Sequence, residues 1–303
     1  MEIKKMKSNF DNLEIEIAIS KPKGEAKGII QIAHGMSEHK ERYFDFMKFM
    51  SEKGYICVIN DHRGHGNSVE KQSDLGYFYT EDKNAIVEDL YQVTEYIKKK
   101  NKDLDVFLFS HSMGTLVARN YLKEHDSEIK KLVLCGPPTY NSLAPLAIGI
   151  AKFLKVFQGD EVRSNFLNRL VFGRYNKGHK KPNEWICSNP EVVDEYNENE
   201  KTGFIFTING FINLFKLMKS AFDKEDWNPN NTDLKILLIA GDEDPVIQSK
   251  KKFYELIEFL KDVGYTNVNS KLYENKRHEI LNGVGKGEIY EGIAEFFENG
   301  GEE

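Results

Sequence analysis

The stretch Ser110-His111-Ser112-Met113-Gly114 follows an apolar run at residues 106–109 and precedes a helix-like segment at residues 115–125. A strand, a sharp turn and a helix are the context in which a G-x-S-x-G motif forms a nucleophile elbow, which holds a serine hydroxyl clear at the top of a sheet. Small residues two positions before and after the serine let the strand and the helix approach closely. Gly114 fits this pattern, whereas Ser110 replaces the usual glycine and predicts a slightly more crowded crossing. The pentapeptide alone is equally compatible with an ordinary loop serine, so the rest of the chain has to decide.

The segments on both sides of this motif alternate between the apolar periods of strands and helices. We expect strands at residues 13–19, 28–33, 55–59, 106–109, 132–135, 235–240 and 269–273, and helices near residues 43–50, 86–97, 115–125, 248–261 and up to residue 297. This alternation predicts an α/β fold with a mostly parallel central sheet and helices on both faces.

The alternation stops in the middle of the chain, where residues 141–228 show no convincing repeat of strand and helix. We therefore expect a core domain made of residues 1–140 and 229–303, with residues 141–228 inserted as a helical cap. The cap is expected to cover the carboxyl edge of the sheet, where open α/β sheets bind their ligands.

A serine hydroxyl becomes a useful nucleophile only when a base removes its proton, and a carboxylate usually orients that base. His278 follows the strand expected at residues 269–273 and is the only histidine in the last hundred residues. An acidic loop follows the strand expected at residues 235–240. The order serine, acid, histidine is that of the α/β-hydrolases, and its coincidence with strand ends predicts catalytic roles for Ser112 and His278.

Three neighbouring carboxylates compete for the role of the acid: Asp242, Glu243 and Asp244. We assign the role to Asp244, because Pro245 stiffens the loop directly after it and Asp242 is better placed to shape the turn. The other two remain as alternatives, with turn or solvent-facing roles expected for them.

The tetrahedral intermediate of acyl transfer needs hydrogen-bond donors for its oxyanion. We expect one from the backbone N–H of Met113, directly after the nucleophile, and one from the backbone N–H of Met36 in the loop after an earlier strand. His34 begins that loop and is assigned to substrate binding, although a histidine ahead of a turn is more often a structural hydrogen-bond partner.

Composition and charge exclude several classes of function. The 303-residue chain has a net charge of −6, and no basic stripe indicates a nucleic-acid partner. Its three cysteines are far apart and show no zinc-binding spacing, so we expect buried thiols and neither disulfides nor a structural metal. His62 and His65 lie in a glycine-rich loop without a rigid helical face, so we expect them to support the active site and not to bind a metal. No cofactor is expected.

The N-terminal residues 1–12 lack the apolar core of a signal peptide, and no run of 18 apolar residues occurs. A cytoplasmic location is therefore expected. Residues 143–157 are apolar except for Lys152 and Lys155, and could lie on a membrane surface, line an acyl channel or pack against the core.

A second apolar stripe in the cap has helical spacing and consists of Phe204, Ile208, Phe211, Ile212 and Phe215. We expect both cap helices to provide apolar walls for a fatty acyl chain, with Phe211 and Phe215 contacting the substrate.

At this point the chain resembles the monoacylglycerol lipase and lysophospholipase family of α/β-hydrolases. The resemblance rests on the elbow, on Asp244, on His278-Glu279 and on two longer motifs: His34-Gly35-Met36-Ser37-Glu38-His39 with Arg42-Tyr43, and Asp61-His62-Arg63-Gly64-His65-Gly66-Asn67-Ser68. It implies that Ser112, Asp244 and His278 form the triad, that Met36 and Met113 supply the oxyanion donors, and that the cap shapes an acyl tunnel. Ser110 departs from the family's usual glycine. The cap shows no motif that carries a substrate preference over.

Three functions remain in competition. The favoured one is a serine hydrolase acting on esters of single-chain lipids. The second is an aminopeptidase of the proline iminopeptidase type, which would need cap carboxylates to hold a free amine; candidates are Glu184, Glu191, Asp194, Glu195, Glu198 and Glu200. The third is a non-catalytic binding protein, which usually lacks a triad residue that this chain retains.

Overall fold

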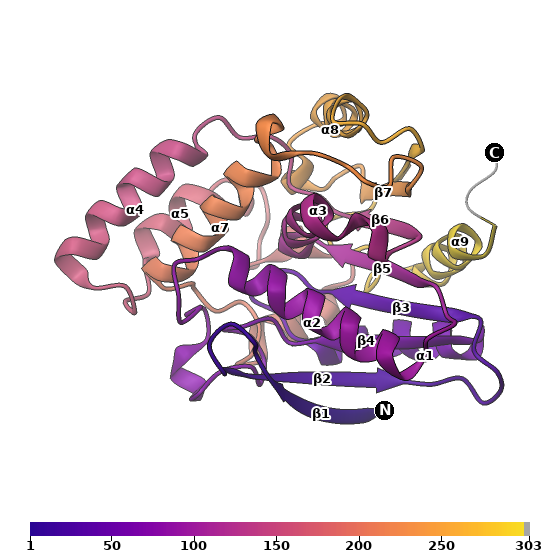
Figure 1. The fold of residues 1–303 in the computed structure, drawn as a ribbon. Coiled ribbons are helices and arrows are strands. Elements are labelled where there is room, and N and C mark those ends of the chain that lie inside the picture. Colours follow the sequence, from indigo (N-terminus) through magenta and orange to yellow (C-terminus); the bar gives the residue numbers. More distant parts are fainter. Residues whose placement is uncertain (300–303) are drawn as a thin grey trace.

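Eight strands form one sheet in the order β1-β2-β4-β3-β5-β6-β7-β8 in the computed structural model, which describes residues 1–299 (Figure 1). The strands are β1 (Glu2–Lys7), β2 (Glu14–Ser20), β3 (Gly28–Ala33), β4 (Tyr55–Asn60), β5 (Val106–His111), β6 (Lys131–Cys135), β7 (Lys235–Gly241) and β8 (Val268–Tyr273). β2 pairs antiparallel with β1 and β4, and every pairing from β4 to β8 is parallel.

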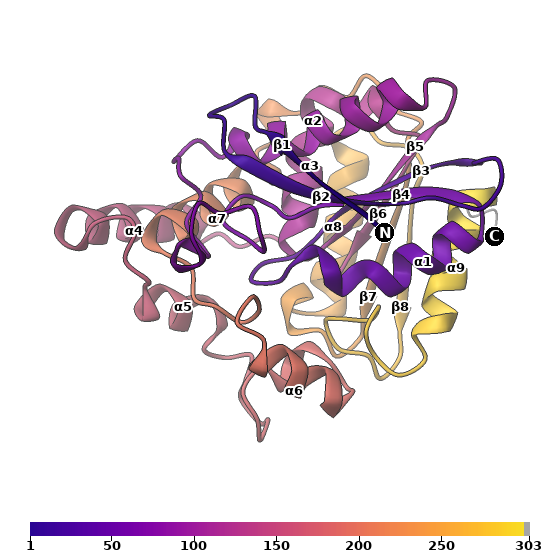
Figure 2. The same ribbon diagram turned by 90° about the horizontal axis from the view of Figure 1, so that it is seen from below.

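The central strands are buried along their whole length and mostly apolar, as expected for parallel strands covered on both faces. Against one face pack α2 (Asn84–Lys100), α3 (Met113–His125) and α8 (Lys250–Asp262). Against the other face pack α1 (Phe44–Glu52) and α9 (Lys286–Asn299), as Figure 2 shows. The predicted α/β-hydrolase architecture is confirmed.

Four helices lie between β6 and β7: α4 (Ala144–Gln158), α5 (Asn165–Phe172), α6 (Pro190–Glu198) and α7 (Ile208–Ala221). Figure 1 shows α4, α5 and α7 together at the end of the sheet to which the arrowheads of β3 and β5 point. α4 packs on α7, and α7 packs on α3, which connects this segment to the core. No helix in the described part of the chain is both long and apolar enough to cross a bilayer.

Two elements differ from the sequence-based expectation. Residues 2–7 form the edge strand β1, which we did not predict. Ile3 is exposed and Met6 is only partly buried, so this segment lacks the alternation of apolar and polar residues that marks a half-buried strand. The helix expected to include Phe204 begins instead at Ile208, where the side chain of Thr207 caps it by accepting a hydrogen bond from the Gly210 N–H. Phe204 therefore belongs to the preceding loop.

Candidate active site

The turn between β5 and α3 has the geometry of a nucleophile elbow. Ser112 has φ 50° and ψ −118°, and its N–H donates to the Cys135 carbonyl at 2.9 Å. A positive φ is uncommon for a residue with a side chain and marks a strained turn. A Cβ at Gly114 would collide with the backbone oxygens of Ala33 and His34, so a glycine is required there.

Ser110 stands where the motif usually has glycine, and its side chain has a partner. Its buried hydroxyl donates to the Val133 carbonyl on the neighbouring strand β6 at 2.9 Å. The side-chain atoms that Ser110 has in addition to a glycine therefore form a cross-strand hydrogen bond within the buried sheet.

Asp244 is the carboxylate that contacts His278. Its Oδ2 lies 2.8 Å from His278 Nδ1, and its Oδ1 accepts a hydrogen bond from the Val246 N–H at 2.8 Å. Both side chains are buried. Because a carboxylate only accepts, Nδ1 carries the proton and Nε2 of the neutral ring is left as the acceptor that a general base needs.

The two competing carboxylates have other partners. Asp242 accepts a hydrogen bond from the Asn275 N–H and lies 3.3 Å from the Lys250 ammonium. Glu243 is largely exposed, and its carboxylate lies 3.9 Å from the Arg277 side chain. Both carboxylates thus shape the loop that presents Asp244.

Ser112 and His278 line the same cavity, whose volume is about 600 Å³. Within the described residues Ser112 Oγ has no hydrogen bond to His278. Such contacts often tighten only when substrate binds. The cavity therefore brings the candidate nucleophile and the candidate base to a common space.

Met36 and Met113 also line this cavity. In the part of the chain that the structure describes, neither backbone N–H donates a hydrogen bond to another protein group. Met113 is the first residue of α3, where unpaired N–H groups and the helix dipole favour a negative charge. The two N–H groups are thus free to bind an oxyanion.

The cavity has one apolar wall and one wall of mixed character. The apolar wall comes from α4 and α7 and includes Leu146, Ala147, Ile150, Leu214, Phe215 and Met218. α5 and the loop after it contribute both polar residues (Asn165, Asn168, Arg169, Asn176 and Asn183) and apolar ones (Leu170, Val171, Phe172, Trp185 and Ile186). A mostly apolar lining with a few polar groups suits an amphiphile with an apolar chain and a polar head.

Of the three residues expected to contact substrate, Phe215 lines the cavity, and Phe211 and His34 do not. Phe211 is fully buried between the rings of Phe206 and Phe215. His34 is also fully buried: its Nε2 accepts from the His62 N–H at 2.9 Å, and its Nδ1 therefore donates to the Gly35 carbonyl at 2.8 Å. The side chains of Phe211 and His34 are therefore enclosed by other protein groups, and the prediction that they contact the substrate is wrong.

His34, His62 and His65 form a buried cluster, with the His34 ring 4.3 Å and 5.3 Å from the other two. Burial lowers the pKa of His62 to about 3 and that of His65 to about 4, so both rings are neutral. His65 packs on Phe204, which lines the cavity. The loop of residues 61–68 thus supports the cavity wall from behind.

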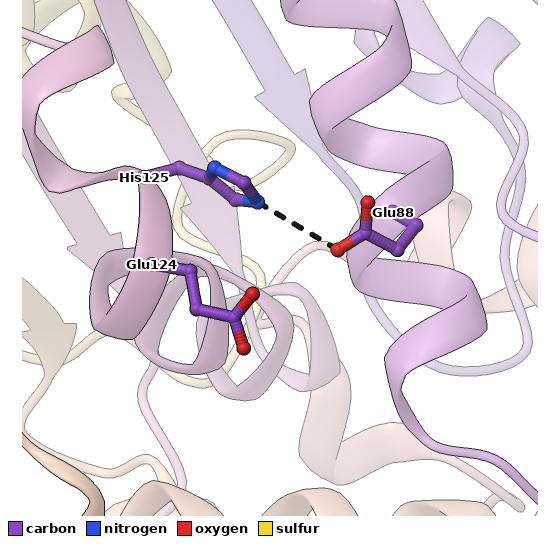
Figure 3. Close-up of side chains that lie close together, drawn as sticks. All are labelled: Glu88, Glu124 and His125. Carbon is purple, nitrogen blue, oxygen red and sulfur yellow. Dashed lines mark ion pairs between the residues drawn. The ribbon is translucent and has the colours of Figure 1, made fainter.

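One group of side chains in the described residues could hold a metal ion, namely Glu88, Glu124 and His125 on α2 and α3 (Figure 3). His125 Nε2 lies 3.6 Å from a Glu88 oxygen, and its ring stacks on Tyr91 at 3.7 Å. None of the three lines the cavity. The ring stack and the approach of His125 to Glu88 form a contact between α2 and α3.

Sequence reasoning missed Trp185, which lines the cavity and packs its ring 5.4 Å from that of His278. It also missed the polar residues of α5. Trp185 is one of two tryptophans in the chain, and that rarity was the only signal available.

The comparisons with known proteins agree with this geometry. The chain is 26% identical to the monoglyceride lipase of Mus musculus over 269 residues, which is 86% of this chain and 78% of that protein. It is 28% identical to the monoacylglycerol lipase of Mycolicibacterium smegmatis over 135 residues, which is 44% of this chain and 46% of that protein. The second match thus spans about half the length of that relative.

Among solved structures, a thermostable carboxyl esterase from Bacillus coagulans superimposes with a TM-score of 0.88 at 26% identity, and 98% of each chain is covered. The family model described as serine aminopeptidase, S33, matches residues 24–284. This match covers most of the chain and, with the relatives named above, shows that the protein belongs to the serine aminopeptidase S33 family of α/β-hydrolases, alongside the monoacylglycerol lipases.

Proposed function

We propose that this protein is a serine hydrolase that cleaves carboxylic esters of single-chain lipids through an acyl-enzyme on Ser112. The observation that carries the proposal is the Asp244–His278 hydrogen bond at 2.8 Å beside a cavity that also contains Ser112 and an apolar wall. Membership in a hydrolase family with monoacylglycerol lipase relatives supports it.

The reaction follows from the proposed roles. His278 Nε2 takes the Ser112 proton as Oγ attacks the ester carbonyl, and the N–H groups of Met36 and Met113 bind the oxyanion. The intermediate collapses, and the alcohol leaves with the proton from His278. Water, activated by the same base, then releases the fatty acid and restores Ser112.

The cap segment, residues 141–228, is proposed as the specificity domain. Its apolar wall would take the acyl chain, and its asparagines and Arg169 would face the alcohol. Phe215 is retained as a substrate-contacting residue. The names of the relatives, monoglyceride and monoacylglycerol lipase, support this substrate class.

We also propose that the cap touches membranes transiently. Its outer face exposes a group of large apolar side chains, among them Leu143, Leu146, Phe153, Val156, Phe157, Phe166 and Leu170. Leu143, Leu146 and Leu170 line the cavity as well, so the apolar surface continues to its mouth. Patches of this kind mark interaction surfaces, and a lipid substrate would enter along this one.

The proposed location is the cytoplasm. Cys57, Cys135 and Cys187 are free and buried, which is compatible with a reducing compartment. Cell fractionation with antibody detection tests this location, and recovery outside the cytoplasm would reject it.

The aminopeptidase alternative is less well supported. None of the six cap carboxylates considered for amine binding lines the cavity. Asp194 pairs with Lys181, and Glu184 accepts hydrogen bonds from the N–H groups of Lys180 and Lys181. The sequence suggested a solvated loop, but four of the six carboxylates lie on α6, and these contacts fit the solvent-facing side of that helix and its flanking loops better than an amine site.

The test is fatty acid release from 1-monoacylglycerols of graded chain length, beside a short p-nitrophenyl ester and a prolyl-naphthylamide, with Ser112→Ala in parallel. We expect hydrolysis that peaks on a medium or long acyl chain and disappears in the variant. Activity only on the short ester would reject the lipid specificity. Cleavage of the prolyl amide would favour the peptidase, and no turnover at all would favour a binding protein.

A further inference from the structure

His111, the residue before the proposed nucleophile, is buried and has two acceptors as its ring partners. Its Nδ1 lies 3.1 Å from Glu38 Oε1, and its Nε2 lies 3.4 Å from the backbone carbonyl oxygen of His278. A carboxylate and a carbonyl can only accept hydrogen bonds. An imidazole donates through both nitrogens only when it is protonated.

The surroundings of Glu38 fit an ionised carboxylate. It accepts hydrogen bonds from the Gly35 N–H, from the Tyr43 hydroxyl at 2.9 Å and from the Arg42 guanidinium at 2.8 Å, in addition to His111. Burial raises the pKa of Glu38, but the hydrogen bond and charge of His111 and the charge of Arg42 hold it well below its usual value. A carboxylate with four donors has no need of a proton.

The balance of buried charge also calls for a second cation. Three carboxylates, Glu38, Glu279 and Asp244, lie around the two histidines, and Arg42 is the guanidinium that bridges Glu38 and Glu279. The other titratable side chains that interact with this group include Tyr43, Tyr175, Tyr196, Cys135 and Cys187, which are neutral because their pKa values are raised, and His34, His62 and His65, which are neutral because their pKa values are lowered. Burial lowers the pKa of His111, but the Glu38 hydrogen bond and charge outweigh it and give a net increase.

We propose that His111 is a protonated imidazolium that donates to both Glu38 and the His278 carbonyl, and that it acts as a positioning residue for the catalytic loops. The effect of His111 on catalysis rests on the proposed function, whereas its protonation state can be measured whether or not that function is correct.

The Glu38–His111 pair connects three loops whose relative positions matter for the reaction. Glu38 fixes the Gly35 N–H, next to the proposed oxyanion donor Met36. The turn packs directly on the pair, because a Cβ at Gly35 would lie 2.6 Å from Glu38 Oε1 and 3.0 Å from His111 Nδ1. His111 itself contacts the backbone carbonyl of His278 and directly precedes Ser112 in the sequence.

The charge has a second effect. The His111 and His278 rings lie 4.6 Å apart, so a cation on the first disfavours a proton on the second. Removing the cation while Glu38 remains ionised should move the acid limb of the pH–rate profile to higher pH.

The direct test is heteronuclear NMR of the isotope-labelled histidine rings at about pH 8, where an ordinary histidine is neutral. The His111 signals are identified by their loss in His111→Gln. We expect both ring nitrogens of His111 to be protonated. One protonated and one bare nitrogen would overturn the proposal, whether or not the protein hydrolyses any ester.

The kinetic test uses a soluble short-chain p-nitrophenyl ester and compares His111→Gln with His125→Gln, which removes a histidine at the far end of α3. For His111→Gln we expect kcat to fall roughly tenfold or more with KM within about twofold, and the acid limb to rise by about half a pH unit or more. His125→Gln should match the wild type. A loss of kcat without any shift of the limb would reduce His111 to a packing role and reject the charge.

Glu38→Gln provides the complementary variant in case His111→Gln folds poorly. The amide removes the anion that keeps His111 protonated, so one His111 ring nitrogen should lose its proton at about pH 8. Persistence of the doubly protonated ring in this variant would contradict the proposed pairing.

Discussion

Replacing Asp244 by Asn tests which of three adjacent carboxylates orients the base. The Asp244 carboxylate accepts two hydrogen bonds, from the Val246 N–H and from His278 Nδ1, both at 2.8 Å. An asparagine can keep both contacts if its oxygen faces Val246 and its NH₂ group faces His278. It then donates to Nδ1, which leaves the proton on Nε2, the atom that must accept from Ser112.

The expected magnitude follows from this tautomer change. In serine hydrolases the corresponding exchange lowers kcat by about four orders of magnitude, equivalent to about 5.5 kcal/mol of transition-state stabilisation. The fold should be affected little, because both hydrogen bonds and the side-chain volume persist. We therefore expect kcat to fall by about 10⁴ while the midpoint of thermal unfolding shifts by only a few degrees.

The assay is hydrolysis of a short p-nitrophenyl ester at neutral pH, with thermal unfolding measured on the same samples. Asp242→Asn and Glu243→Gln are the matched controls, since both carboxylates lie in the same loop without contact to His278. Both controls should keep activity within a few-fold of the wild type. A loss confined to either control, or an active Asp244→Asn, would refute the assignment.

Three further perturbations test the elbow, the buried histidines and the cap. Gly114→Ala should destabilise the fold by about 1–3 kcal/mol, because its Cβ would meet backbone oxygens, whereas Gly149→Ala in α4, with open space around it, should be neutral or stabilising in the same denaturant titration. Burial depresses the folded-state pKa values of His62 and His65, so the stability that their neutral forms contribute is fully present above about pH 6.5 and is lost as the pH falls below it, by about 1.4 kcal/mol per pH unit for each; His111, whose pKa is raised, adds no slope below about pH 6.5 because it is then protonated in both states, and a constant unfolding midpoint down to about pH 4.5 would contradict this. Phe157→Glu on the exposed cap face should weaken sedimentation with lipid vesicles several-fold and spare short-ester hydrolysis, whereas Val284→Glu outside the cap should bind as the wild type does; equal binding by all three proteins would remove the membrane proposal.

The sequence predicted the sheet well because its central strands carry continuous apolar runs, and their ends fix the loops that carry chemistry. Ser112, Asp244 and His278 are separated by more than one hundred residues at their extremes, yet each follows a strand in the parallel part of one sheet. Strand order therefore brought them to one edge without any knowledge of side-chain packing.

The sequence could not show which face of a cap helix borders the cavity. Phe211 and Phe215 lie one turn apart on the same apolar stripe, but only Phe215 lines the cavity, because Phe211 packs against Phe206. Helical spacing of apolar residues identifies a buried stripe, but it does not show which element or cavity that stripe packs against. The same limit applies to His34, whose side chain is directed to the backbone of residue 62.

The pairing of Glu38 with His111 was likewise hidden, because 73 residues separate the two and the other partners of Glu38, namely Gly35, Arg42 and Tyr43, are all local in sequence. Both belong to motifs that the sequence singled out for other reasons. Their contact depends on the approach of the loop after β3 to the end of β5, which only the fold provides.

The central claim is that Ser112 is the nucleophile, and covalent labelling tests it most directly. The protein is treated with a fluorophosphonate, its intact mass is measured, and the modified peptide is mapped. The account predicts one stoichiometric adduct on Ser112 that is absent in Ser112→Ala and blocked by prior incubation with a monoacylglycerol. A label on another residue, or equal labelling of Ser112→Ala, would contradict it.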